Sequence, residues 1–286
     1  MKHPGQLLKE AGIFAKRELG QNFLFRPDTA NIIVEKVKIL QNYHVLEIGP
    51  GLGALTIEIA GKAGHVTVVE KDARLIPLLK TVIQNQGISN IKILHDDILK
   101  INIKEIAQDN KLIVLGNLPY NISSQVLFKL IKERDCIEKA VLTFQKEMAD
   151  RISASPGTKD YSRLSVLARY AADIRFIANI SPACFFPKPE VNSTVLSFNF
   201  FKQTESDNIQ ESLLFDIVKA AFSKRRKTLK NSMAGGELKY EKQFILQALT
   251  MAGIDAQRRA ETLSVEEFKK ITQAVWMLNM ETVDNS

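Results

Sequence analysis

HVLEIGPGLG, residues His44–Gly53, is the segment that decides the fold expected for this chain. Its first half, His44–Ile48, has the apolar character of a short buried strand, and an apolar helix is expected from Ala54 to about Ala60. Glycines between a strand and a helix permit positive φ and let a ligand approach the backbone closely, as at nucleotide-binding turns. The order of strand, glycine turn and helix therefore predicts an α/β fold with a ligand at the turn.

The spacing of the glycines distinguishes between two kinds of nucleotide cofactor. A dinucleotide site favours a third glycine further into the helix, in the G-x-G-x-x-G pattern. In this chain Gly49, Gly51 and Gly53 alternate after the acidic Glu47, a spacing typical of proteins that bind S-adenosylmethionine. Gly49 and Gly51 are therefore predicted to contact that cofactor.

Two further apolar strands end in acidic residues. Val66–Val69 precedes Glu70, and Ile91–Leu94 precedes the acids Asp96 and Asp97. Glu70 is expected to accept both hydroxyl groups of the cofactor ribose. One of the two later acids is expected to accept the adenine amine of the cofactor, and we choose Asp97. The carboxyl ends of parallel strands share one edge of a sheet, so these acids are expected beside the glycine turn.

A fourth apolar run, Leu112–Leu115, leads to the tetrad Asn117-Leu118-Pro119-Tyr120. An adenine amine is a poor nucleophile because its lone pair is delocalised into the ring. The Asn117 side-chain oxygen and the Leu118 backbone carbonyl would accept the two amine hydrogens and stabilise the charge that develops on methylation. Pro119 would hold the turn rigid, and Tyr120 would stack on the base. The tetrad predicts amine methylation, with an ordinary strand-to-turn transition as the alternative.

These motifs resemble those of the ribosomal RNA adenine N6-dimethyltransferases of the small-subunit (KsgA/RsmA) type, nearly from end to end. Lys16–Leu24 resembles a family segment that folds over the cofactor, which implies contacts from Asn22 and Leu24. Phe185–Ser193 resembles the family loop Phe-x-Pro-x-Pro-x-Val-x-Ser, which implies that Phe185 and Tyr120 sandwich a flipped adenine. One of the two phenylalanines that open this loop is expected to be a core residue instead.

Two C-terminal segments, Phe222–Ser232 and Arg259–Ser264, also resemble the small-subunit enzymes. The resemblance implies S-adenosylmethionine-dependent N6,N6-dimethylation of two adjacent adenosines in the 3′-terminal hairpin loop of 16S rRNA. The implied partner is 16S rRNA within a partly assembled 30S subunit. Two alternatives stay open: a large-subunit rRNA adenine methyltransferase, and an assembly factor that binds immature 30S subunits with methylation secondary. A small-molecule N-methyltransferase is a more distant third.

The charge of the chain is concentrated locally. The net charge is +7, yet residues 202–286 carry 13 basic and 12 acidic side chains and are nearly neutral. The basic side chains of that region gather in a basic patch formed by Lys224, Arg225, Arg226, Lys227 and Lys230. Such a patch beside an RNA-type active site predicts phosphate binding, with a solvated helix face as the alternative. Lys16 and Arg17 would extend the patch toward the substrate.

These patterns predict a Rossmann-like class I methyltransferase of the α/β class with a mainly parallel sheet, plus a small all-helical C-terminal domain. The catalytic domain is expected over residues 1–201, with an N-terminal arm over 1–22. A linker is expected over 202–208 and the helical RNA-binding domain over 209–286. The alternating residues Thr194–Phe200 are expected to form an edge strand of the sheet.

Residue types that mark metals, disulfides or membranes are few. The chain has two cysteines, Cys136 and Cys184, and four scattered histidines, so neither a metal site nor a disulfide is expected. It shows no signal-peptide pattern and no apolar run of membrane-spanning length. A cytoplasmic, monomeric enzyme is the expectation.

Overall fold

The computed structural model describes residues 2–108, 110–202, 205–224, 226–235 and 238–284. The chain divides into two compact units: Met1–Ala149 with Ala171–Phe201, and Asp150–Tyr170 with Lys202–Ser286. This division groups Asp150–Tyr170 with the C-terminal unit, whereas the expected boundary at residue 201 places that segment in the catalytic domain. Which unit binds the cofactor and which binds RNA stays a prediction.

The first unit is built on a sheet of seven strands in the order β4-β3-β2-β5-β6-β9-β7. Neighbours from β4 to β6 run parallel, β9 runs antiparallel to β6, and β7 runs antiparallel to β9. The mainly parallel α/β sheet is therefore confirmed. The strands are β2 (His44–Ile48), β3 (His65–Glu70), β4 (Ile91–His95), β5 (Leu112–Asn117), β6 (Ile137–Gln145), β7 (Ala172–Ile180) and β9 (Ser193–Phe200).

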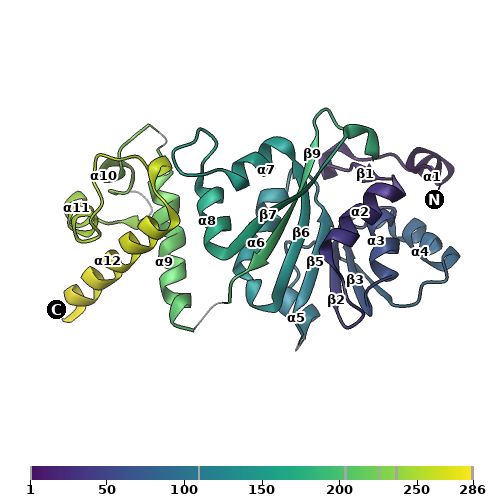
Figure 1. Cartoon of the computed structure of the whole chain (residues 1–286), viewed down its shortest axis with the longest axis horizontal. Coiled ribbons are helices and arrows are strands. Elements are labelled where there is room, and N and C mark those ends of the chain that lie inside the picture. Colours follow the sequence, from purple (N-terminus) through teal and green to yellow (C-terminus); the bar gives the residue numbers. More distant parts are fainter. Residues whose placement is uncertain (1, 109, 203–204, 225, 236–237, 285–286) are drawn as a thin grey trace. The chain divides into compact units, whose positions relative to one another are not determined.

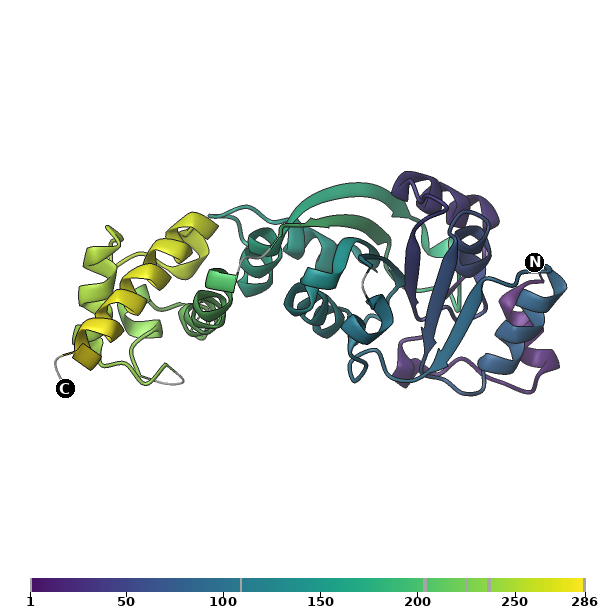
Figure 2. The same ribbon diagram turned by 90° about the horizontal axis from the view of Figure 1, so that it is seen from below.

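Helices lie on both faces of this sheet (Figures 1 and 2). On one face, apolar side chains of α2, α3 and α4, such as Val34, Ile59 and Leu79, pack against Val45 and Val66 of the strands. Burial of these side chains removes apolar surface from water and fixes the helices on the sheet. The helices are α1 (Pro4–Glu10), α2 (Pro27–Val37), α3 (Ala54–Ala60), α4 (Ile76–Asn85), α5 (Ile103–Ala107), α6 (Ser123–Lys132) and α7 (Lys146–Ser153).

The strand expected at Thr194–Phe200 forms as β9, but the prediction that it lies at the sheet edge is wrong. β9 lies between β6 and β7, and β7 is the edge strand. The burial of the two strands explains this order, because β9 is buried over most of its length whereas β7 exposes Arg175 and 61% of Phe176. A register irregularity between Phe176 and Ala178 further interrupts the edge.

A second, two-stranded sheet joins the N-terminal arm to the loop before β9. β1 (Phe23–Leu24) pairs antiparallel with β8 (Phe185–Phe186), so that Phe23 lies opposite Phe186 and Leu24 opposite Phe185. This pairing holds the N-terminal arm close to the glycine turn.

The second unit is helical in its described residues, as predicted. Buried side chains of α9, α11 and α12, among them Ile217, Leu249 and Phe268, form its core. Because α9 begins at Glu205, residues 205–208 of the expected linker are helical. No helix among the described residues is both long and apolar enough to cross a membrane. The helices are α8 (Arg163–Ala171), α9 (Glu205–Ala221), α10 (Leu229–Ser232), α11 (Lys242–Met251) and α12 (Val265–Asp284).

Candidate functional site

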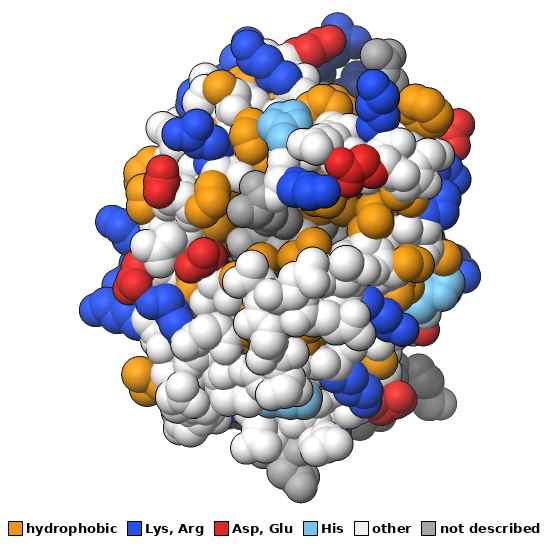
Figure 3. Space-filling view, turned by 90° about the vertical axis from the view of Figure 1, so that its right-hand side faces the viewer, with side chains coloured by type: hydrophobic (Ala, Val, Ile, Leu, Met, Phe, Trp, Pro, Cys, Tyr) orange, Lys and Arg blue, Asp and Glu red, His pale blue; other side chains and the backbone are white. Residues whose placement is uncertain are grey.

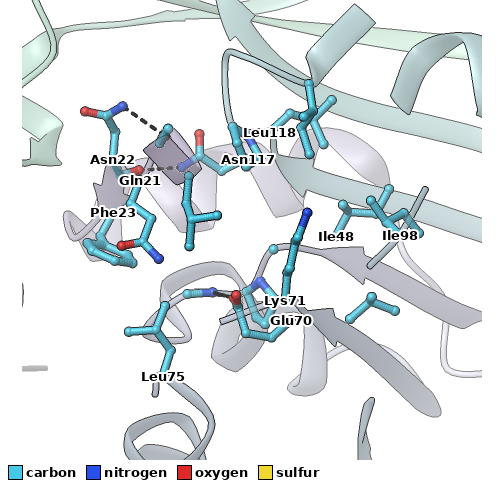
Figure 4. A pocket seen from close by; sticks show the side chains of 18 of the residues that line it. Gln21, Asn22, Phe23, Ile48, Glu70, Lys71, Leu75, Ile98, Asn117 and Leu118 are labelled. Atoms are coloured by element: carbon cyan, nitrogen blue, oxygen red, sulfur yellow. Dashed lines mark hydrogen bonds between the residues drawn. The ribbon is translucent and has the colours of Figure 1, made fainter. Parts of the chain in front are cut away.

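The predicted site residues come together at the carboxyl ends of β2, β3, β4 and β5, where a pocket opens (Figure 4). All the residues expected to hold the cofactor line this pocket, and so do Leu118 and Pro119 of the tetrad. Tyr120 and Phe185 do not line it. Those brought together here are Asn22, Leu24, Gly49, Gly51, Glu70, Asp97, Asn117, Leu118 and Pro119.

The glycine turn after β2 needs glycine for conformational reasons. Gly49, Gly51 and Gly53 have φ of +67°, +56° and +88°, a region in which a side chain collides with the backbone. The turn is fixed by the Gly49 N–H, which donates to the Val69 carbonyl at 3.0 Å. The Gly51 N–H turns instead toward β3 and donates to Glu70 Oε2 at 3.1 Å.

Glu70, at the end of β3, is only 6% exposed and accepts two backbone N–H groups. Besides Gly51, the Asp72 N–H donates to Glu70 Oε1 at 2.8 Å. Burial raises the pKa of Glu70, and these backbone donors oppose the rise. Each carboxylate oxygen keeps a further lone pair, so this side chain can still accept hydroxyl donors from a ligand.

Asp97, after β4, lines the pocket beside Lys71, the residue that follows Glu70. Lys71 Nζ lies 2.8 Å from Asp97 Oδ2, and the Leu99 N–H donates to Asp97 Oδ1 at 3.0 Å. Burial opposes ionisation of this carboxyl, but the two donors outweigh it, so the pKa of Asp97 is lowered. Asp97 is therefore an anionic acceptor at neutral pH, suited to an amine donor.

Asn117 ends β5 and faces the N-terminal arm across the pocket (Figure 4). Its Nδ2 donates to the Asn22 carbonyl oxygen at 2.8 Å. Because the amide nitrogen is engaged in this way, the orientation of the side chain is fixed and Oδ1 is left as a hydrogen-bond acceptor. That is the group that the tetrad hypothesis assigns to the target amine.

Tyr120 is held by its hydroxyl group. The hydroxyl lies 2.9 Å from Ser193 Oγ at the start of β9, and burial raises the pKa of Tyr120. Phe185 is only 3% exposed and belongs to the same core as Leu24, whereas Phe186 is half-buried and packs edge-to-face against His3. A ring as buried as Phe185 would have to leave the core to stack on a base, so the Phe185 contact stays a prediction.

The arm residues 16–24, which we call the strap, reach the site through contacts that the motifs did not reveal. Gln21 Nε2 donates to Asp72 Oδ2 at 2.8 Å, and Asn121 Nδ2 donates to the Glu18 carbonyl at 2.9 Å. Asp72 also binds Arg74, whose hydrogen bonds lower the pKa of Asp72 to about 2. The only sequence signal for Asp72 is its position two residues after Glu70.

Glycine at position 51 also makes room for the strap. A Cβ there would lie 2.8 Å from the Phe23 ring, in a backbone with φ of +56°. We expect Gly51→Ala to lower the free energy of unfolding by about 2–4 kcal/mol, the sum of backbone strain and displacement of the ring. Gly87→Ala is the matched control, since Gly87 has φ of +66° and open space around it.

Urea denaturation of both variants checks this expectation. Gly87→Ala should lose about 1–2 kcal/mol from backbone strain alone. Equal losses of unfolding free energy in the two variants would mean that a methyl group at position 51 does not displace the Phe23 ring. The Gly51 variant should in addition bind cofactor more weakly than the Gly87 variant.

Glu47 is a buried carboxyl in the wall of the pocket. It is 1% exposed, and its Oε2 has no hydrogen-bond partner among the described residues. Burial raises the pKa of Glu47 to about 8. A protonated carboxyl with one unpartnered oxygen in the wall of the pocket suits a ligand that brings positive charge, which would favour the ionised form.

The raised pKa predicts a pH dependence of stability. The unfolded chain releases the Glu47 proton near pH 4.5, whereas the folded chain retains it to about pH 8. Stability contributed by this group is therefore lost as the pH rises between these values. We expect Glu47→Gln to be more stable than wild type at pH 8 by about 1–4 kcal/mol, with little difference at pH 4.5. Urea unfolding at both pH values, with Glu58→Gln as control, measures it; a gap independent of pH would contradict it.

The basic patch lies in the second unit on an exposed loop and the start of α10. Lys224, Arg226 and Lys227 are exposed and Lys230 is half-buried, while Arg225 lies outside the described residues. The start of α10 is held next to the other C-terminal segment, because the Leu229 N–H donates at 2.8 Å to the carbonyl of Arg258, the residue before that segment. On the face drawn in Figure 3, by contrast, Lys and Arg side chains are scattered among Asp and Glu.

The fold and the pocket define a class I methyltransferase: a Rossmann-like sheet whose strand ends carry a glycine turn, two acids and an Asn-Leu-Pro-Tyr tetrad. Residues 13–275 match the model of the family described as ribosomal RNA adenine dimethylase, and the chain belongs to that family.

Several known proteins are similar along most of their length. Ribosomal RNA small subunit methyltransferase A of Desulforapulum autotrophicum is 50% identical over 279 residues, which cover 98% of each chain. The protein of the same name from Lysinibacillus sphaericus is 38% identical, covering 95% of this chain and 94% of its own. A dimethyladenosine transferase from Plasmodium falciparum is a solved structure with TM-score 0.74 and 27% identity, covering 87% of this chain and 95% of its own.

Proposed function

We propose that this enzyme dimethylates N6 of two adjacent adenosines in the 3′-terminal hairpin loop of 16S rRNA, within a partly assembled 30S subunit. The methyl donor is S-adenosylmethionine, which supplies an electrophilic methyl group on its sulfonium. The observation that carries the proposal is the Asn117 amide: its nitrogen is tied to the Asn22 carbonyl, and its oxygen is left at the pocket as an acceptor. The relatives named for the small ribosomal subunit support the substrate class.

The wall of the pocket offers a partner for each part of the methyl donor. Glu70 would accept the ribose hydroxyls, Asp97 would accept the adenine amine, and the backbone of Gly49 and Gly51 allows close approach. Asn22 and Leu24 would cover the donor from the strap. The unpartnered carboxyl of Glu47 fits a cationic ligand on the same wall.

The chemistry assigned to the tetrad is placement and charge stabilisation. Asn117 Oδ1 and the Leu118 carbonyl would accept the two hydrogens of the target amine, which draws its lone pair out of the ring and toward the methyl group. Tyr120, held by Ser193, would stack on the target base from one side. The donor would leave as S-adenosylhomocysteine when its sulfonium S–C bond breaks, and the methylated amine would lose one proton to solvent. One amine hydrogen would then remain, so a second transfer from a fresh donor can follow in the same site.

The second unit is proposed to hold the RNA. Its exposed basic patch would bind phosphates and orient the subunit, while the tetrad selects the base. We further propose that the enzyme acts as a cytoplasmic monomer and needs no metal. Among the described residues, no cluster of metal-ligating side chains was found.

Incubation of the protein with radiolabelled S-adenosylmethionine and unmethylated small subunits tests the proposal. Digestion and mass spectrometry should find N6,N6-dimethyladenosine at two adjacent positions near the 3′ end of 16S rRNA. Label in large-subunit RNA would identify a large-subunit methyltransferase instead. Tight binding to subunits without label would identify an assembly factor.

A further inference from the structure

One end of the sheet carries polar side chains where a parallel sheet is normally apolar. The strand register places His44 beside His65, and Thr67 beside Lys92. Side chains alternate along a strand, so these four share one face of the sheet. On the opposite face, Val45 and its neighbours on β3 and β4 are apolar and packed in the core. Strands covered on both faces are typically apolar throughout, so this polar group needs its own explanation.

The polar face forms the floor of a second cavity, which we call the amino-end groove. The helix beside it, α5, spans only Ile103–Ala107 and leaves the amino ends of β2, β3 and β4 uncovered. Most of the lining side chains can hydrogen-bond. Among them are His44, His65, Thr67, Lys92, Lys100 and Asn102.

The lining carries two ammonium groups, Lys92 and Lys100, and two carboxylates, Asp96 and Glu105, so its formal charges balance. Lys92 and Lys100 are exposed, and neither makes a salt bridge with any described residue. Of the two carboxylates in the lining, Glu105 already accepts a hydrogen bond from Asn102 Nδ2 at 3.1 Å. Neither ammonium group is held in a salt bridge, although Lys100 helps to lower the pKa of Asp97, so both can contact phosphate oxygens.

The histidines add hydrogen-bonding groups to this charge. His44 Nε2 lies 2.8 Å from Thr67 Oγ1, and the rings of His44 and His65 meet edge-to-face at 4.6 Å. Burial, together with the nearby His65 and Lys92, lowers the pKa of His44 to about 4. His44 is therefore neutral at pH 7, and the lysines carry the positive charge of the groove.

The groove and the candidate active site have one lining residue in common. Asp96 lines both the groove and the pocket that holds Glu70 and Asn117. Both cavities therefore lie on the first unit and adjoin just after the end of β4. A polymer with regularly spaced anionic groups fits an open polar groove of this kind better than a compact small molecule, which needs an enclosing apolar pocket.

We propose that the amino-end groove binds the phosphate backbone of an rRNA segment outside the methylated loop, with Lys92 and Lys100 contacting phosphates. This inference rests on the proposed function, because it takes rRNA as the substrate. The side-chain amides and His44 would donate to phosphate or 2′-hydroxyl oxygens, which lets the groove prefer RNA.

The test compares two double variants of the full chain with wild type. Lys92→Gln with Lys100→Gln removes both charges of the groove. Lys36→Gln with Lys80→Gln is the matched control, because these two lysines are exposed on α2 and α4 and line neither cavity. Equilibrium binding to unmethylated small subunits is measured over a range of salt concentrations, and kcat is measured at saturating subunits.

The groove variant should bind about tenfold more weakly than the control, and its salt dependence should fall by about one to two ion equivalents. Its kcat should match that of the control. Binding and salt slope equal to those of the control would overturn the inference. Weaker binding with an unchanged salt slope would also overturn the inference, because the groove would then contact a ribosomal protein rather than RNA phosphates.

Failure of the proposed function gives a different result. Wild type that methylates no rRNA overturns both the function and the groove. Wild type that methylates small subunits normally, with a groove variant that behaves like the control, overturns the groove alone.

Discussion

Replacement of Asn117 by alanine should lower kcat by about 10²–10³, because one preorganised acceptor for the developing positive charge is lost. Asn117 Oδ1 is the group in question, since its Nδ2 already donates to the Asn22 carbonyl. The loss should be confined to the chemical step, so kcat and kcat/KM for RNA should fall together. Single-turnover methylation of unmethylated subunits measures it.

Asn121→Ala is the matched control for this experiment. Asn121 also ties the strap to the tetrad region through its amide nitrogen, which donates to the Glu18 carbonyl at 2.9 Å. That variant loses a strap contact of the same kind but keeps the Asn117 acceptor. We expect it to retain kcat within about tenfold of wild type, the loss of one ordinary hydrogen bond. Similar losses in the two variants would show that Asn117 acts by holding the strap rather than by catalysis.

Each site residue predicted from the sequence belongs to a local sequence pattern. Gly49, Glu70, Asp97 and Asn117 each follow an apolar run, and parallel strands bring such ends to one edge. The order of the strands was not accessible in this way. Alternation in Thr194–Phe200 indicates a strand, but it does not show whether that strand has one neighbouring strand or two. In the structure, β9 has two neighbours, β6 on one side and β7 on the other.

The contacts that were missed depend on pairing between distant segments. Phe23 meets Gly51 only because β1 pairs with β8, more than a hundred residues further along the chain. The same pairing buries Phe185 and leaves Phe186 against His3, a choice between adjacent phenylalanines that their sequence does not reveal. Gln21 and Asp72, 51 residues apart in the sequence, form a hydrogen bond that no local motif indicates.

Replacement of Glu70 by alanine should weaken S-adenosylmethionine binding by about 10²–10³-fold. The variant would leave the Gly51 and Asp72 N–H groups, now 3.1 and 2.8 Å from the carboxylate, without their acceptor. These unpaired donors lower the stability of the free and the cofactor-bound protein alike. The loss of affinity comes from the ribose contacts, because two hydrogen bonds to a charged acceptor at about 1.5–3 kcal/mol each account for this range. Calorimetric titration with S-adenosylmethionine measures the dissociation constant.

The affinity of Glu70→Ala for S-adenosylmethionine is compared with that of Asp97→Ala. The side chain of Asp97 is 14% exposed, and one of its partners is the solvent-accessible Lys71, so water can replace part of what is lost. We expect about a tenfold loss for Asp97→Ala, with Glu58→Ala close to wild type. If Glu70→Ala bound the donor as well as Asp97→Ala, the carboxylate would not be the ribose acceptor. Its hydrogen bonds would then serve only to fix the glycine turn, and urea denaturation would show a stability loss without the loss of affinity.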